Sequence, residues 1–316
     1  MPAGTWKEAV KNRPRAPFGG VSGASRLAYF GAVNAAAAPP PPTAGRLPLT
    51  AHGALRVPEV ALAFWIVKGL STAMGESTSD ALVNSSLGAP VSVLLGFIAF
   101  VGALTLQFRT ARYRAWTYWL TVCMVGVFGT MAADVMHVAL HVPYTASTIF
   151  YACVLAAVFI LWSRTERTLS IHSIDTPRRE AFYWAAVAAT FATGTALGDF
   201  TANTLKLGYF PSAALFAGLI LIPLLGWRFL RGNPVLCFWA AYVVTRPLGA
   251  SLADGLGKPK NVSGLGWGDG PVALALTALI ALLVAYLAVT KRDVQREVAG
   301  AESGADAARP SAVEAP

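Results

Sequence analysis

Charged residues are scarce in this sequence. Asp, Glu, Lys and Arg make up only 13% of its 316 residues, whereas 55% are hydrophobic and the mean hydropathy is +0.54. A soluble globular protein carries about 25% charged residues. The composition therefore excludes an ordinary soluble domain and predicts an integral membrane protein with several spans, whose main partner is the lipid bilayer.

The sequence also lacks the usual marks of catalysis and of disulfide bonding. Its three cysteines all lie in apolar runs, which argues against a disulfide framework. It contains no phosphate-binding glycine loop, no GxSxG elbow and no HExxH motif. Its loops are too short to form a soluble catalytic domain. We therefore expect neither an enzyme nor a bound cofactor.

Both ends of the chain differ in composition from the middle. Residues 1–56 are basic and include a run of alanine and proline at 35–42, and residues 291–316 are polar. Such segments cannot form a packed core. We predict two disordered cytoplasmic tails on either side of a membrane domain at 57–290.

The membrane domain contains four copies of one segment with the pattern [FY]-W-x9-G-x3-[SAG]-D. The copies are FWIVKGLSTAMGESTSD at 64–80, YWLTVCMVGVFGTMAAD at 118–134, YWAAVAATFATGTALGD at 183–199 and FWAAYVVTRPLGASLAD at 238–254. The shared positions are the tryptophans Trp65, Trp119, Trp184 and Trp239, the glycines Gly75, Gly129, Gly194 and Gly249, and the aspartates Asp80, Asp134, Asp199 and Asp254. Four fixed positions in four ungapped copies indicate internal duplication.

A second apolar run without charges follows each copy and begins near a proline, which suits the first turn of a helix. About 20 apolar residues are enough to span a bilayer. The pattern predicts an all-α membrane protein with eight transmembrane helices. They form four parallel two-helix repeats, at approximately 57–112, 113–177, 178–232 and 233–290.

The basic residues predict how the repeats are oriented. Arginines gather between the two-helix repeats, on the same side as both tails, whereas the other side holds only Lys206, Lys258 and Lys260. The positive-inside rule then places both termini in the cytoplasm, and we expect a multi-pass protein of the inner membrane. This placement explains the net charge of +9 without a nucleic-acid partner.

The repeated segment resembles a known family. Its most typical stretch is VPEVALAFWIVKGLSTAMGESTSD, at the start of the membrane domain. Over about residues 57–290 the sequence is similar to bacterial membrane-anchored proteins that carry four tandem two-helix repeats of unknown function. The resemblance implies the eight-helix fold, and it implies no activity.

Acidic residues recur on one face of the first helix of each repeat. At about 100° per residue, each tryptophan and aspartate share a stripe with mostly small or polar residues, and Glu76 lies on the stripe of the first repeat. The glycines lie on a neighbouring stripe and are expected to allow close helix packing. The acids have two interpretations, an interior cavity and solvated caps at headgroup level, while the tryptophans suit packing or an interfacial belt.

Two basic residues interrupt the same helices. Arg246, which precedes Pro247, is expected to form a buried ion pair with an acid of another repeat, because an unpaired charge inside a membrane is costly. Lys68 either faces the interior or snorkels to the surface. The predicted ion pathway comprises Glu76, Asp80, Asp134, Asp199, Asp254, Lys68 and Arg246.

The segment DVMHVALH suggests a metal site. It places Asp134, His137 and His141 at offsets of 3 and 7 residues, which lie on one face of an α-helix. Divalent metals accept imidazole and carboxylate ligands together. The alternative interpretation is a pair of ordinary exposed histidines.

These patterns favour a secondary transporter. Symmetry-related ionisable residues inside a membrane often mark substrate and proton pathways. We expect a small cation to move through an acidic cavity formed by the four repeats, with a divalent metal as one candidate substrate and protons as one candidate coupling ion. The alternatives are a scaffold or sensor that transports nothing, and a metal-dependent intramembrane enzyme built on Asp134, His137 and His141.

Overall fold

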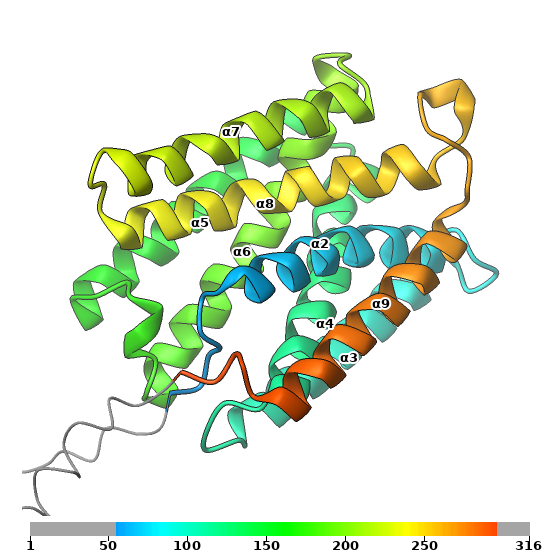
Figure 1. The fold of residues 1–316 in the computed structure, drawn as a ribbon. Coiled ribbons are helices and arrows are strands. Elements are labelled where there is room, and N and C mark those ends of the chain that lie inside the picture. The colour runs from blue at the N-terminus through cyan, green and yellow to red at the C-terminus, as the bar shows by residue number, and fades with distance from the viewer. Residues whose placement is uncertain (1–54, 296–316) are drawn as a thin grey trace, which may run out of the picture. The chain divides into compact units, whose positions relative to one another are not determined.

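A computed structural model describes residues 55–295, and this part of the chain is all-α, without strands (Figure 1). It contains eight long helices, two from each repeat. Their bounds are α2 (Leu62–Val83), α3 (Gly88–Phe108), α4 (Ala115–Asp134), α5 (Tyr144–Glu166), α6 (Pro177–Asp199), α7 (Tyr209–Phe229), α8 (Pro234–Gly257) and α9 (Asp269–Thr290). The predicted all-α fold is therefore confirmed.

Four short helical elements complete the described structure. The 3₁₀ turns η2 (Ile171–Ser173) and η4 (Lys260–Val262) lie in connecting loops. The π-helical turns η1 (Val135–Ala139) and η3 (Phe200–Thr204) continue α4 and α6 without a break. Because a π turn is wider than an α turn, side chains beyond Asp134 and Asp199 do not keep the spacing of an α-helix.

The first helix of each repeat lies inside the bundle and the second lies outside. The inner helices contact one another in the closed order α2, α4, α6, α8 and back to α2. Each outer helix packs chiefly on the inner helix of the following repeat: α3 on α4, α5 on α6, α7 on α8, and α9 on α2. Figure 1 shows α7 beside α8 and α9 beside α2. The four repeats therefore close into a ring.

Six of the eight helices are long and apolar enough to span a membrane, namely α3, α4, α5, α7, α8 and α9. The inner helices α2 and α6 fall outside this group: α2 carries Lys68, Glu76 and Asp80, and α6 has charged residues at both ends and three threonines within it. The apolar windows of α3, α5 and α7 are only 17% buried, whereas that of α4 is 61% buried. The bundle is thus apolar outside and more polar within, as expected of a membrane protein.

The repeated glycines set the distance between neighbouring inner helices. Each one faces the residue that lies seven positions after the tryptophan of the next repeat: Gly75 faces Gly126, Gly129 faces Phe191, Gly194 faces Arg246 and Gly249 faces Thr72. A Cβ on Gly75 would lie 2.8 Å from a backbone atom of Gly126, which is too close. The packing role predicted for these glycines is therefore observed at all four junctions.

The ordered structure extends slightly further than predicted at both ends. Arg56 forms a 2.5 Å ion pair with the buried Glu180, and the buried Asp293 accepts a hydrogen bond from the Tyr113 hydroxyl. Burial and this carboxylate together raise the pKa of Tyr113 above its usual range. The backbone N–H of Glu59 donates to the carbonyl of Asp293 at 2.8 Å, so the two ends lie side by side. The remainder of each predicted tail lies outside the described residues.

Candidate functional site

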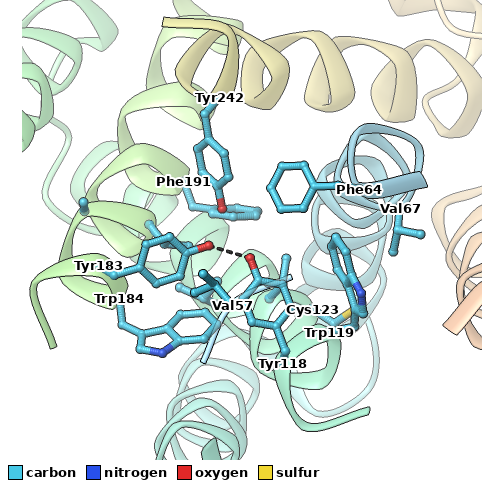
Figure 2. Close-up of a cluster of buried hydrophobic side chains, with 14 of the residues drawn as sticks. Val57, Phe64, Val67, Tyr118, Trp119, Cys123, Tyr183, Trp184, Phe191 and Tyr242 are labelled. Atoms are coloured by element: carbon cyan, nitrogen blue, oxygen red, sulfur yellow. Dashed lines mark hydrogen bonds between the residues drawn. The ribbon is translucent and has the colours of Figure 1, made fainter. Parts of the chain in front are cut away.

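The N-terminal ends of the inner helices meet in a ring of aromatic side chains. The aromatic residue before each tryptophan contacts the tryptophan of the next repeat. The centroid distances are 5.7 Å for Phe64–Trp119, 5.5 Å for Tyr118–Trp184, 6.1 Å for Tyr183–Trp239 and 5.7 Å for Phe238–Trp65. Figure 2 shows part of this ring, with the 2.5 Å hydrogen bond between the hydroxyls of Tyr118 and Tyr183. Because these ends meet, the four inner helices run in the same direction.

Halfway along the inner helices, Arg246 joins all four repeats. Its Nη2 lies 2.6 Å from Glu76 Oε2, 2.5 Å from Thr130 Oγ1 and 2.6 Å from Thr195 Oγ1. Glu76, Thr130 and Thr195 are all eleven residues after the tryptophan of their own repeats. The ion pair that the sequence predicts for Arg246 is therefore present, and its partner is Glu76.

Some hydrogen-bond donors of the Arg246 guanidinium have no acceptor among the described residues. Its Nη2 carries only two hydrogens for three acceptors, while Nε and Nη1 are buried without a hydrogen-bond partner among the described residues. The guanidinium also lies 5.3 Å from the centroid of the Phe191 ring. A buried charge that is only partly hydrogen-bonded is costly, so this junction is held in place by the surrounding fold.

Lys68 lies between the aromatic ring and Arg246, and it faces the interior. It is fully buried, and its Nζ lies 4.1 Å from the Phe191 ring centroid and 4.3 Å from that of Tyr242. No hydrogen-bond acceptor reaches Nζ within the described part of the chain. Lys68 therefore forms no ion pair with the acids of the predicted pathway, and its contacts are cation–π contacts.

The C-terminal ends of the inner helices bring the acidic residues together. Glu76, Asp80 and Asp254 each place a carboxylate oxygen within 4.8 Å of the other two. Asp134 lies within electrostatic reach of Asp199, and Asp199 within reach of Glu76. The five acids of the predicted pathway thus occupy one neighbourhood, which we call the acidic end, and every repeat contributes to it.

Lys258, just beyond α8, supplies a half-buried cation at the acidic end. Its Nζ lies 2.5 Å from Asp80 Oδ2 and 3.5 Å from Asp269 Oδ2. Burial alone would lower the pKa of Lys258, but the carboxylates of Asp80, Asp254 and Asp269 outweigh this effect and raise the pKa above its usual range. The ammonium therefore remains charged and neutralises part of the cluster.

The loop at 258–268 holds Lys258 in this position. It folds back on the last turn of α8 through backbone hydrogen bonds from Leu265 to Gly255, from Gly266 to Lys258 and from Trp267 to Leu256, at 2.7, 2.8 and 3.1 Å. These bonds keep the loop over the acidic end.

The structure does not bring Asp134, His137 and His141 together as a group of ligands among the described residues. Of the described residues, the group whose ligand atoms could share one ion is Glu76, Asp80 and Asp254. His137 Nδ1 lies 2.9 Å from the carbonyl of Val142, and its ring stacks on Tyr144 at 3.5 Å. His141 is exposed, with a φ of 54°. The π turn after Asp134 breaks the α-helical spacing on which the prediction relied.

Four residues of the site were missed by the sequence-based prediction. Thr130 and Thr195 occupy the same repeat position as Glu76, so the alignment of the repeats already contained that signal. Lys258 and Asp269 lie outside the repeated segment, so the repeat pattern does not indicate them. Their approach to Asp80 depends on the folding of the loop at 258–268, which no local pattern indicates.

Comparison with known families gives the same four repeats. The family model described as Repeat of Unknown Function (DUF347) matches residues 63–113, 117–168, 182–233 and 237–293. The chain belongs to this family. Each DUF347 repeat covers one inner helix and the outer helix that follows it. No curated protein and no solved structure matches the chain.

Proposed function

We propose that this DUF347 protein is a secondary transporter for a small cation, and that the acidic end is its binding site. In this proposal all eight helices cross the inner membrane. Helices α2 and α6 do so because the other helices shield their polar residues. The end of the bundle at which residues 55 and 295 lie faces the cytoplasm, as the arginines between the repeats indicate, and the acidic end faces the opposite side.

One observation carries the proposal: acidic residues of all four repeats lie at the same end of a closed ring of helices, and those of the first and fourth repeats share one cluster. Six acids lie there with two nearby basic residues, Arg246 and Lys258, so acidic groups outnumber basic groups at the site. Ionisable groups inside a membrane protein are costly and often mark ion pathways. The three oxygen donors of Glu76, Asp80 and Asp254 suit hard cations such as Mg²⁺, Ca²⁺ or Mn²⁺.

Lys258 supports a cation as the ligand, because its ammonium already lies on Asp80. An incoming cation would replace this ammonium, and the loop at 258–268 would move with it. Carboxylates that hold protons would release them when the cation binds, which is how a proton gradient could be coupled to transport.

The remaining parts of the bundle supply a barrier. Arg246 and the aromatic ring fill the path between the acidic end and the cytoplasmic end with buried side chains. Release on the cytoplasmic side would require neighbouring repeats to separate at the aromatic ring, by movement of the repeats against one another around the site.

The test is cation flux in proteoliposomes that contain the purified full-length chain. Mn²⁺, Ca²⁺, Mg²⁺, Na⁺ and K⁺ would be assayed separately, each with and without a pH gradient. Flux of at least one cation is expected, and Asp199→Asn combined with Asp254→Asn should abolish it while the protein stays folded by circular dichroism. Glu59→Gln, an exposed acid at the other end of the bundle, is the matched control and should retain flux.

Two results would reject transport. Wild-type protein that moves none of these cations would favour a scaffold or sensor, in which the acids are structural. Undiminished flux in the double variant would show that the ions take a different path.

A further inference from the structure

A large apolar cavity lies on the side of the bundle, away from the acidic end. Its volume is about 740 Å³, within the range of about 300–1,000 Å³ that is usual for small-molecule sites. Helices α2, α7 and α8 form its walls, and the segment at 169–172 closes one end. The wall residues that matter here are Trp65, Gly69, Pro223, Trp227 and Phe238.

The cavity lies where α7 leaves the repeat tryptophan of α2 uncovered, whereas α5 covers the corresponding tryptophan of α8. At the end of α5, Phe159 and Trp162 pack on Trp239 at 4.9 and 5.7 Å, and Trp162 is fully buried. Trp227 has a similar place near the end of α7, yet it is 56% exposed. Its potential partner Trp65 is the only one of the four repeat tryptophans that is not buried in the described structure.

Two residues in the walls account for this gap. Pro223 lies inside α7, where proline removes a backbone hydrogen bond and bends the helix. Gly69 leaves open space on α2, since no atom lies within 4 Å of where its Cβ would be. The corresponding residues of the other repeats are Cys123, Ala188 and Val243, all of which have a side chain. The cavity is therefore a local departure from the fourfold pattern.

The surroundings of the cavity indicate what would fill it. Helix α7 is one of the membrane-like outer helices, and its apolar window is only 17% buried, so the cavity faces the hydrocarbon of a bilayer. At its Trp227 end, Arg228 and Arg231 are exposed, and neither forms an ion pair within residues 55–295. An apolar cleft with unpaired arginines beside it matches a lipid that has an acyl chain and an anionic headgroup.

We propose that this cavity is a specific site for an anionic phospholipid. One acyl chain lies between Trp65 and Trp227, over Gly69, and the phosphate of the headgroup lies near Arg228 and Arg231. The site is separate from the acidic end, so it does not depend on the transport proposal, and the lipid is a bound partner and not the cation substrate.

The test is photo-crosslinking of the full-length chain in nanodiscs that contain a trace of phosphatidylglycerol with a diazirine at the end of one acyl chain. Mass spectrometry of the digested protein should find the label concentrated on α2, α7 and α8 around the cavity. In discs where the probe is phosphatidylcholine of the same chain length, labelling at these positions should fall at least threefold.

Two test variants and one control variant make the result decisive. Gly69→Leu should fill the cavity and reduce its labelling at least fivefold, whereas Gly102→Leu, at an exposed and equally open position on α3, should leave it unchanged. Arg228→Gln with Arg231→Gln alters only exposed residues, so it tests the headgroup without disturbing the core, and it should remove the preference for phosphatidylglycerol.

The proposal is overturned if the label spreads evenly over the outer helices, or if Gly69→Leu leaves it in place. Equal labelling by both lipids would likewise reject the anionic site. Cation flux would be measured on the same protein preparations reconstituted in proteoliposomes. Flux without site-specific labelling would reject the lipid site alone, and labelling without flux would reject the transport proposal alone.

Discussion

The two ends of the four inner helices come from the same repeated segment, but one end keeps the fourfold pattern of contacts and the other does not. At the aromatic end, one contact occurs four times around the ring, and Trp119, Trp184 and Trp239 are buried. At the acidic end, the aspartates recur, but the residues around them differ from repeat to repeat. The position eleven residues after the tryptophan is Glu76, Thr130, Thr195 or Ala250.

This difference indicates which positions maintain the ring and which provide chemistry. Aromatic contacts and glycine junctions must fit at every interface, because a misfit at one would open the closed ring. By contrast, Arg246 alone reaches an acceptor in each of the three other repeats. A second arginine at the same level would find these acceptors already occupied. The symmetric positions therefore build the scaffold, and the asymmetric positions, Glu76 and Arg246 above all, give it a polar centre.

The largest effect is expected at the aromatic end. Trp119→Ala should lower the free energy of unfolding by about 3–5 kcal/mol, because a fully buried indole leaves a cavity. Trp65→Ala should cost clearly less, since Trp65 is partly exposed. Denaturation in detergent, followed by circular dichroism, measures both. Equal losses of unfolding free energy would contradict the inference that Trp65 contributes less to packing than the three buried repeat tryptophans.

A comparable effect is expected at the centre. Arg246→Met should cost about 3–5 kcal/mol, since it leaves Glu76 as an unpaired buried carboxylate. Glu76→Gln in the same chain should recover much of this loss, because the amide needs no counter-ion. The same denaturation assay on both single variants and the double variant gives the coupling energy. If the losses of unfolding free energy in the two single variants simply add in the double variant, Arg246 and Glu76 are not energetically coupled.

The glycine junctions should give an intermediate effect. Gly194→Ala should cost about 1–3 kcal/mol, because the new methyl group would overlap the Arg246 side chain and Pro247. Gly218→Ala, on the exposed face of α7, is the matched control and should be neutral or slightly stabilising. A neutral Gly194→Ala would show that the inner helices can separate at no cost.

The smallest effect on stability is expected at the acidic end. Asp199→Asn should change the free energy of unfolding by roughly 0.5 kcal/mol or less, because the side chain is partly exposed and lies among like charges. Cation binding, measured by calorimetry, should nevertheless weaken. Severe destabilisation without any effect on cation binding would show that Asp199 is structural. The acidic end would then be part of the scaffold, like the aromatic end.

Local sequence patterns predicted the helices correctly, but they predicted only some of the contacts between the helices. The repeat pattern predicted the four inner helices and a packing role for their glycines, because both follow from the spacing of residues within one helix, whereas the residue that each glycine faces belongs to another repeat. The residues of the proposed histidine site are not brought together, because a π turn follows Asp134 and a helix-face argument assumes unbroken α-helical spacing. The partner of Arg246 could be given only as an acid of another repeat, since several acids were available.

The sequence by itself determined the membrane-like composition, the fourfold repeat and its parallel direction, because hydropathy and duplication are local properties of the chain. Only the tertiary structure decided that Glu76 pairs with Arg246, that Lys258 lies on Asp80 and that α7 leaves a cavity beside α2. These contacts join residues far apart in the chain, and they depend on how closely neighbouring helices approach once the ring is closed.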